Sequence, residues 1–146
     1  MHETSLKAKK EADMKKQKYS AVPAAVNLIL ALVAAIGSRT FLGPCVHEDG
    51  TFGACHWAGQ ALFGIALVMA AEGLIAALWK NAAVRAGLYI SMLLTAILGI
   101  LIPGTLISLC GMASMRCRTV MRPSMMILFS LMFVAAGTGA LLSREG

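Results

Sequence analysis

The chain has 146 residues, of which 58% are hydrophobic and only 14% are charged. A soluble domain carries about 25% charged residues, so this composition excludes an ordinary soluble protein and indicates one that faces lipid. The net charge of +6 does not indicate nucleic-acid binding, because six of the thirteen basic residues are lysines gathered between Lys7 and Lys18, ahead of the first apolar run. We expect a single-domain membrane protein whose first partner is the lipid bilayer and which has no nucleic-acid partner.

Residues 1–19 form a cationic segment in which Leu6, Met14 and Tyr19 supply the large apolar side chains. So few apolar residues predict no packed core here. One alternative is an amphipathic helix in the membrane interface, where each basic residue near an anionic leaflet contributes about 1 kcal/mol. The other is a disordered cytoplasmic tail, and the sequence leaves both open.

Residues 20–146 are predicted to form an all-α, integral membrane four-helix bundle. The first apolar run is too long for the core of a typical signal peptide, so we expect it to be retained. Four segments are each long enough to cross a bilayer. They lie at about residues 20–38, 58–79, 83–102 and 123–142.

Polar residues and breakers mark the ends of these spans. Pro23 is expected in the opening turn of the first span, where its missing N–H costs little. The second and third spans are close enough in sequence to form a tight hairpin, and Pro103-Gly104 either ends or kinks the third. The apolar stretch 105–109 is too short to cross alone, so we expect it to lie in the interface or to re-enter.

The distribution of basic residues predicts the orientation, because cytoplasmic loops carry an excess of lysine and arginine. With the N-terminus inside, nine basic residues lie on the cytoplasmic side and four on the outer side. We therefore expect a multi-pass protein of the cell membrane, with both termini in the cytoplasm. Both cysteine-containing loops then face outward. The outer four are Arg39, Arg116, Arg118 and Arg122.

The four cysteines are expected in an oxidising compartment, where an even number normally forms disulfides. The first outer loop carries Cys45 and Cys55, and the second carries Cys110 and Cys117. Pairing within each loop or between the loops is compatible with the sequence. A disulfide-braced outer cap is our principal interpretation.

Two other roles for the cysteines stay open. One pair in each of two outer loops is the layout of quinone-linked thiol oxidases of the DsbB and vitamin K epoxide reductase type, but the Cys-x-x-Cys motif of those enzymes is missing. The alternative is a soft-metal or haem site, since thiolate, thioether and imidazole suit Cu(I) or haem iron. Its candidate ligands besides the cysteines are His47, His56, Met112 and Met115. Later methionines, from Met121 to Met132, are interpreted as core filler.

Glu72 is the other candidate site residue, because a carboxylate about two turns inside a span costs of order 2.5–3.5 kcal/mol and must find a partner. Asn27, Ser91 and Thr95 are the candidate hydrogen-bond partners, and the alternative is that Glu72 is protonated. A helix–helix hydrogen bond and a contact to a partner subunit are the favoured roles, ahead of a proton relay.

Aromatic and basic residues near the ends of the spans complete the candidate set. Trp57 and Trp79 are about 22 residues apart, which matches the distance between the two membrane interfaces, so both are interpreted as anchors. Gln60 lies beside Trp57 at the outer interface. Three arginines form a predicted outer basic patch that meets lipid phosphates, a haem propionate or an acidic partner. They are Arg116, Arg118 and Arg122.

Several motifs of the chain resemble a known family. They are Gly43-Pro-Cys45, the segment Cys55-His-Trp-Ala-Gly-Gln60, Met115-Arg-Cys117 and Arg122-Pro123. The family consists of small four-span bacterial and archaeal membrane proteins described only as a domain of unknown function, with a Cys-His-Trp segment at the head of the second span. The resemblance covers nearly the whole chain, and the family has no established activity that could be carried over. It implies an accessory role beside ABC exporters of the macrolide-exporter type.

These observations predict a non-catalytic accessory or ligand-binding subunit of a membrane complex. The expected partner is another membrane protein subunit or a second copy of the chain, and no cofactor is required. The alternatives are a quinone-linked thiol oxidoreductase and a soft-metal or haem binding or transport protein.

Overall fold

The computed structural model describes residues 2–42, 53–108 and 117–144, and these residues are almost entirely helical. Four long helices run antiparallel to their neighbours in sequence, and a short π-helical turn precedes the last. The elements are α1 (His2–Arg39), α2 (Ala54–Leu78), α3 (Ala82–Leu101), η1 (Cys117–Met121) and α4 (Arg122–Arg144).

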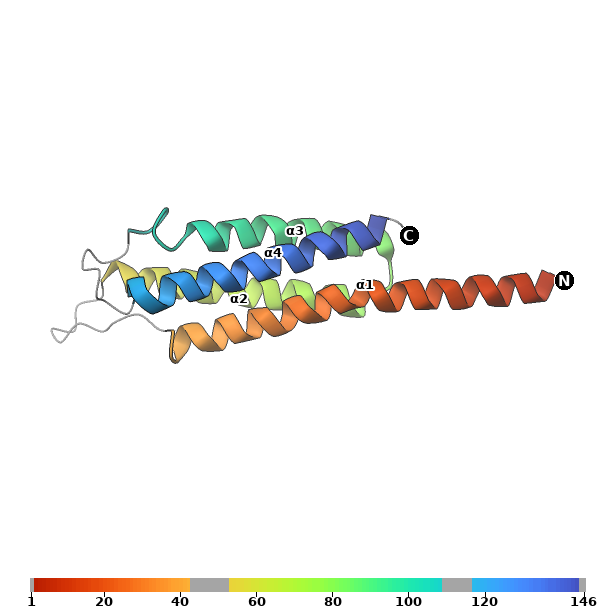
Figure 1. Ribbon diagram of the computed structural model, residues 1–146, viewed down its shortest axis with the longest axis horizontal. Coiled ribbons are helices and arrows are strands. Elements are labelled where there is room, and N and C mark those ends of the chain that lie inside the picture. Colours follow the sequence, from red (N-terminus) through yellow and green to blue (C-terminus); the bar gives the residue numbers. More distant parts are fainter. Residues whose placement is uncertain (1, 43–52, 109–116, 145–146) are drawn as a thin grey trace.

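All four long helices contain a segment that is long and apolar enough to cross a membrane. The fold is therefore the predicted all-α, four-helix membrane bundle. Both chain ends and the α2–α3 connection lie at one end of the bundle (Figure 1), while α1 and α3 finish, and α2 and η1 begin, at the other. Both termini thus lie on the same side of the bundle. The described residues that flank the two longer connections lie at the opposite end.

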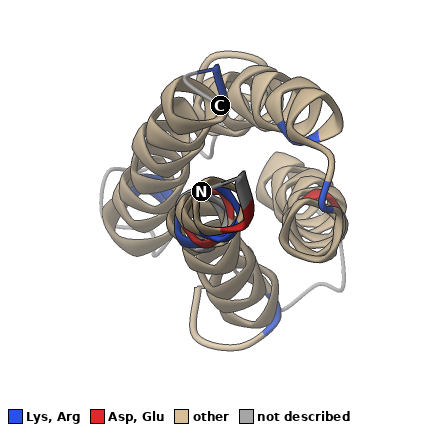
Figure 2. Ribbon diagram, turned by 90° about the vertical axis from the view of Figure 1, so that its right-hand side faces the viewer, with Lys and Arg blue, Asp and Glu red and all other residues tan. Residues whose placement is uncertain are grey.

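The N-terminal segment continues the first span as one helix. α1 extends straight beyond the rest of the bundle (Figure 1). The described side chains of this extension are exposed. Viewed from the N-terminal end, this extension carries most of the visible acidic and basic residues, whereas the other helices are largely uncharged (Figure 2). The segment is helical, as one alternative held, but it is no separate element. Pro23 consequently lies inside α1, and its predicted place in an opening turn is wrong.

Two helices begin earlier than hydropathy indicated. α2 begins at Ala54 rather than near residue 58, which places Cys55, His56 and Trp57 in its first turn. The fourth span begins with η1 at Cys117, six residues before Pro123. The third helix ends at Leu101, and Pro103-Gly104 terminates it rather than kinking it.

α1 and α2 pack closely because small residues line their contact. Gly73 of α2 lies against the α1 backbone, where a Cβ atom would come within 3.2 Å of Leu28 N and 3.3 Å of Ala24 O. Without a hydrophobic drive between helices in lipid, such close backbone approach is what holds spans together. The alanines buried on α1 and α2 are Ala24, Ala31, Ala34, Ala35, Ala58, Ala66, Ala70 and Ala76.

α3 and α4 use the opposite device, a large ring against a glycine. The Phe129 ring of α4 covers Gly99 of α3, and the Tyr89 ring of α3 covers Gly139 of α4. Both rings are fully buried. Because each helix contributes one ring and one glycine, the two contacts fix the register of the pair at two levels.

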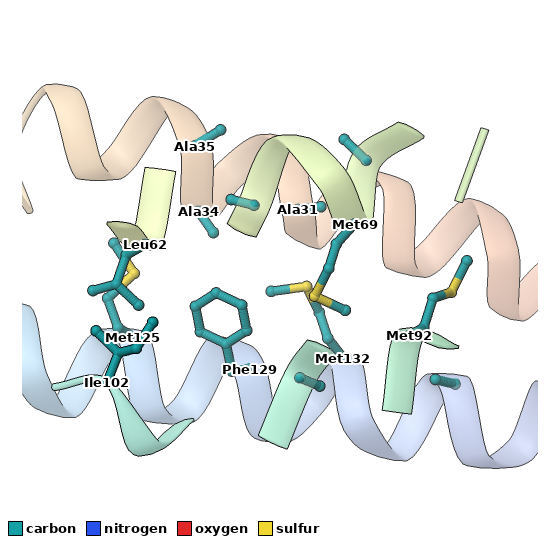
Figure 3. Packing of buried hydrophobic residues seen from close by; sticks show 14 of the residues in the cluster. Ala31, Ala34, Ala35, Leu62, Met69, Met92, Ile102, Met125, Phe129 and Met132 are labelled. Atoms are coloured by element: carbon teal, nitrogen blue, oxygen red, sulfur yellow. The ribbon is translucent and has the colours of Figure 1, made fainter. Parts of the chain in front are cut away.

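Methionine fills the space between the two helix pairs. Figure 3 shows Met69 of α2 and Met132 of α4 pointing toward one another beside Phe129, with Met125 beside Leu62 and Ile102. The unbranched thioether side chain adapts to irregular gaps. The sequence interpretation as core filler is confirmed for Met121, Met125 and Met132, each at most 1% exposed, whereas Met126 is only partly buried.

The helices do not contact one another equally. α1 packs against both α2 and α4, and α3 packs mainly against α4. α2 and α3 are joined by a short connection, yet they share far less contact than the α1–α2 and α3–α4 pairs. We call the boundary between α2 and α3 the α2–α3 seam.

Candidate functional site

Glu72 and Ser91 form the polar contact of the α2–α3 seam. Ser91 Oγ on α3 donates a hydrogen bond to Glu72 Oε1 on α2 at 2.5 Å. Thr95, one turn further along α3, donates its hydroxyl to the Ser91 carbonyl at 2.9 Å. Of the three candidate partners for Glu72, Ser91 is therefore confirmed. Thr95 hydrogen-bonds the Ser91 backbone of α3 and does not contact the carboxylate.

The second carboxylate oxygen of Glu72 has no hydrogen-bond partner. Oε2 is buried and meets no donor within the described residues. A buried acceptor left in this state costs about 1–3 kcal/mol, and more when it carries charge. The residue as a whole is only partly buried, so Glu72 lies near the surface of the bundle, although Oε2 itself is covered.

Asn27 of α1 carries a second unsatisfied oxygen. The residue is fully buried, and its Nδ2 donates to the Pro23 carbonyl at 3.3 Å. Its Oδ1 has no partner among the residues described. Gly73 follows Glu72 directly and lies against α1 at Ala24 and Leu28, the residues on either side of Asn27 on that face. Asn27 and Glu72 are thus at the same level of the bundle.

Arg85 and Tyr89 are buried polar residues that the sequence analysis did not single out. Arg85 is 3% exposed and Tyr89 is fully buried, and the Arg85 side chain hydrogen-bonds the Tyr89 hydroxyl, which also reaches the Ala24 backbone. The sequence placed Arg85 with the cytoplasmic basic residues at the hairpin. Its spacing of four residues from Tyr89, on the face that continues to Met92 and Ala96, is the signal that it points inward.

A bracing contact joins α1 and α2 at the end of the bundle opposite the chain termini. Arg39 Nη2 donates to Gln60 Oε1 at 2.8 Å, and the guanidinium lies 4.1 Å from the centre of the Phe63 ring. Arg39 was counted only for orientation, and Gln60 only as an interface residue. The structure gives both a place in one contact between helices.

The remaining described candidates lie at the membrane boundaries. Trp57 and Trp79 are 63% and 55% exposed, as expected of interface anchors. His56 contacts the Trp57 ring edge-on, with the ring centres 5.8 Å apart. A tryptophan beside a polar ring at a helix end is typical of the membrane–water interface.

Two of the three arginines of the predicted outer basic patch lie within the described residues. The Arg122 guanidinium lies over Gly104, which has a φ of 99° in the turn that ends α3. A side chain at Gly104 would both strain that backbone and meet Arg122. Arg118 is exposed, and Arg116 lies outside the described residues.

Two of the four cysteines lie within the described residues. Cys55 and Cys117 are 1% and 0% exposed; Cys45 and Cys110 lie outside the described residues, as do His47, Met112 and Met115. No disulfide is seen within the three described ranges, so the braced cap stays a prediction. In those same ranges no three His, Cys, Asp or Glu side chains gather as metal ligands would.

One family model matches the chain over residues 27–142, and it is described as "Domain of unknown function (DUF4418)". The match spans α2, α3 and η1 completely, together with most of the membrane-spanning parts of α1 and α4. It confirms the resemblance seen in the sequence motifs. No curated protein and no solved structure matches the chain.

Proposed function

The chain belongs to the DUF4418 family, and from that premise we propose that it is a non-catalytic accessory or ligand-binding subunit of a membrane complex, which binds at the α2–α3 seam. The observation that carries this proposal is the half-satisfied carboxylate of Glu72. Ser91 holds one oxygen, and the other is buried without a donor. An ABC exporter is the partner that the sequence resemblance implies.

The energetics support binding. A carboxylate at this depth costs of order 2.5–3.5 kcal/mol, and a bond to one serine hydroxyl returns only part of that. A donor from a partner helix or ligand would satisfy Oε2 and remove the remaining penalty. The bundle alone therefore leaves free energy that association at the seam can recover.

The same geometry does not favour catalysis by Ser91. A serine nucleophile needs an oxyanion hole, built from donors that are free to face the developing charge. Ser91 lies in the interior of α3, where backbone N–H groups are bonded to the preceding turn. Its hydroxyl is better suited to hold the Glu72 carboxylate than to attack a substrate.

No observation on the described residues favours the two alternative functions. A thiol oxidoreductase needs an accessible low-pKa thiolate, whereas Cys55 and Cys117 are buried. Of the candidate ligands in the soft-metal or haem alternative, only His56, Cys55 and Cys117 lie within the described residues, and no cluster of three possible ligands is found there. Disulfides in an outer cap remain compatible with the proposed binding role, because they would only fix the loops.

Purification from native membranes tests the proposed function. We expect a second protein to accompany the wild-type chain in a constant ratio, and the Glu72→Gln variant to lose at least nine-tenths of it, because the amide removes the charge with little change of shape. Quantitative mass spectrometry of gently solubilised material measures the ratio. Thr138→Val is the matched control, since Thr138 is an exposed polar residue of α4 whose hydroxyl bonds only its own helix, to the Ala135 carbonyl.

The Thr138→Val variant should keep its partner in full. If the wild-type chain runs alone, or if Glu72→Gln and wild type retain the same companion equally, the seam is not the binding surface and the proposal is wrong.

For the orientation we propose that both termini are cytoplasmic, at the cell membrane. The excess of basic residues near the tail and hairpin supports this, nine against four. We expect a C-terminal green fluorescent protein fusion to be fluorescent and a C-terminal alkaline phosphatase fusion to be inactive in a bacterial host, because the phosphatase folds only outside the cytoplasm. An active phosphatase would show that the C-terminus lies outside the cytoplasm. The topology would then be the reverse of the proposed one, with the two longer connections in the cytoplasm.

A further inference from the structure

The part of α1 that projects beyond the other helices carries most of the charge visible from that end of the molecule (Figure 1, Figure 2). We call it the α1 extension, residues 2–18. Six lysines and three acids give it a net charge of +3. Its two large apolar residues, Leu6 and Met14, are both 57% exposed and form no continuous apolar stripe. A surface of this kind binds by charge rather than by apolar burial, so its partner is negatively charged.

The boundary between the membrane span and the α1 extension lies near Tyr19. Gly73 of α2 packs against Ala24 and Leu28 of α1, and the two helices are antiparallel. Trp79, six residues after Gly73, is therefore level with about residue 20 of α1. Tyr19 and Trp79 are 65% and 55% exposed, as expected of aromatic residues at a membrane–water interface. The α1 extension thus begins where the lipid headgroups do.

In the straight α1, only half of the six lysines lie close to that interface. At about 1.5 Å per residue, the three nearest lysines lie within ~6 Å of Tyr19 along the helix axis. The other three, Lys7, Lys9 and Lys10, lie ~14–18 Å from it on the same scale. A charged lipid surface attracts basic residues over about one Debye length, which is ~8 Å in physiological salt. The three outer lysines therefore reach such a surface only if the α1 extension bends towards it.

Pro23 marks the point at which α1 bends most easily. The residue lies inside α1, so its missing N–H removes one bond of the helix ladder, to the Tyr19 carbonyl, and its ring crowds that carbonyl. Sharp bends in helices occur mostly at proline. Ala24, the next residue, is fully buried and lies against α2, so the bundle holds α1 from there on. A bend at Pro23 consequently moves the α1 extension and leaves the span in place.

We infer that the α1 extension binds a surface of anionic phospholipid headgroups, and that α1 bends at Pro23 to bring all six lysines to it. Each basic residue near such a surface contributes about 1 kcal/mol, and the three acids offset part of that gain. Phospholipid is favoured over an acidic soluble protein because the α1 extension is joined directly to a membrane span, which keeps lipid at a high effective concentration. This binding needs neither Glu72 nor the α2–α3 seam, so it is independent of the proposed function.

Contact quenching of a fluorophore at the N-terminus of the purified full-length chain tests the inference. The chain is placed in lipid nanodiscs that contain a phosphatidylcholine with a nitroxide on its headgroup, which quenches only at short range. In a straight α1 the N-terminus lies ~27 Å beyond Tyr19, out of reach of the nitroxide. We expect quenching at least threefold stronger in discs of equal parts phosphatidylglycerol and phosphatidylcholine than in discs of phosphatidylcholine alone. About 1 M sodium chloride should abolish the difference, since it shortens the Debye length to ~3 Å.

Two sets of charge variants should change the quenching in opposite directions. Replacing Lys7, Lys9 and Lys10 by glutamine brings the net charge of the α1 extension to zero, and should reduce the extra quenching at least threefold. Neutralising the three acids raises the net charge to +6, and should at least halve the share of phosphatidylglycerol needed for half of the effect. This matched set consists of Glu3→Gln, Glu11→Gln and Asp13→Asn. All six positions are exposed, so neither set disturbs the bundle.

Pro23→Ala tests the bend. Alanine restores the missing N–H and favours a straight helix, so the extra quenching should fall at least twofold, while circular dichroism checks that the helix content is retained. Unchanged quenching would show that α1 does not bend at Pro23. Equal quenching in the two lipid compositions, or a difference that persists at high salt, would overturn lipid binding itself. So would an α1 extension that stays unquenched in both compositions yet binds soluble polyglutamate, because its partner would then be an acidic protein.

Discussion

Replacing Phe129 by alanine should destabilise the bundle by about 3–5 kcal/mol, the range found when a buried aromatic ring is deleted. The Phe129 side chain is fully buried and its ring covers Gly99 of α3. Because Gly99 has no side chain that could move into the space, the cavity would stay open. Reversible unfolding of the purified protein, from mild detergent into dodecyl sulfate, measures the change in free energy of unfolding.

Phe133→Ala is the matched control, one helical turn further along α4. Phe133 is 38% exposed, so lipid or detergent chains refill the volume that its ring leaves. We expect a loss below about 1 kcal/mol, because in lipid the removed ring is replaced by an equally apolar neighbour. Equal losses at the two positions would mean that Phe129 is not buried in a rigid core and that its contact with Gly99 is misplaced.

The architecture could be predicted from the sequence because hydropathy measures how apolar a segment is, and a segment that spans a membrane must be apolar. A bilayer core needs about 20 apolar residues per span, and four such runs with a short hairpin leave little choice of topology. The predicted third span, 83–102, differs from α3 by one residue at each end. Span number, span order and the shared side of the termini could all be derived in this way.

The helix ends were harder to predict because hydropathy locates the lipid rather than the helix. A helix continues past the bilayer wherever its backbone bonds allow, and polar side chains there do not stop it. α1 therefore runs through the whole lysine-rich segment, and α2 includes the Cys55-His56-Trp57 turn. The π-helical turn η1 has no hydropathy signature, so nothing in the sequence marked Cys117 as a helical residue.

Which face of each span points inward was the main missing information. In a soluble helix the apolar stripe identifies the core, but here lipid-facing and core-facing residues are both apolar. Residue size still indicates which face points inward. Gly73, Gly99 and Gly139 face neighbouring helices, while large side chains such as Leu94 and Leu141 face the lipid.

The candidate site was predicted where a single residue broke the apolar pattern. Glu72 could be identified because a carboxylate in a span needs a partner, and Ser91 was among the three partners considered. The unsatisfied Asn27 oxygen was out of reach, since it depends on how closely α1 and α2 approach. The burial of Arg85 was not predicted, because the residue lies only two positions inside the predicted span 83–102 and was counted with the basic residues of the hairpin.

Gly139→Ala should lower the free energy of unfolding by about 2–3 kcal/mol, near the upper end of the usual cost of overpacking. A Cβ atom at residue 139 would overlap the Tyr89 ring. That ring cannot easily move aside, because it is fully buried and its hydroxyl is held by Arg85 and the Ala24 backbone. The same detergent unfolding assay measures the effect.

Gly137→Ala, two residues away on the same helix, separates overlap from helix propensity. A Cβ there has only Leu93 Cδ2 nearby, at 3.9 Å, so the variant should be neutral or up to about 1 kcal/mol more stable, as alanine is the better helix former. Adding Tyr89→Leu should make Gly139→Ala nearly harmless, because the smaller side chain vacates the space. The double-mutant cycle of Gly139→Ala and Tyr89→Leu therefore gives a coupling energy of about 2–3 kcal/mol if ring and glycine touch. Additive losses would mean that the Tyr89 ring does not lie against Gly139 of α4.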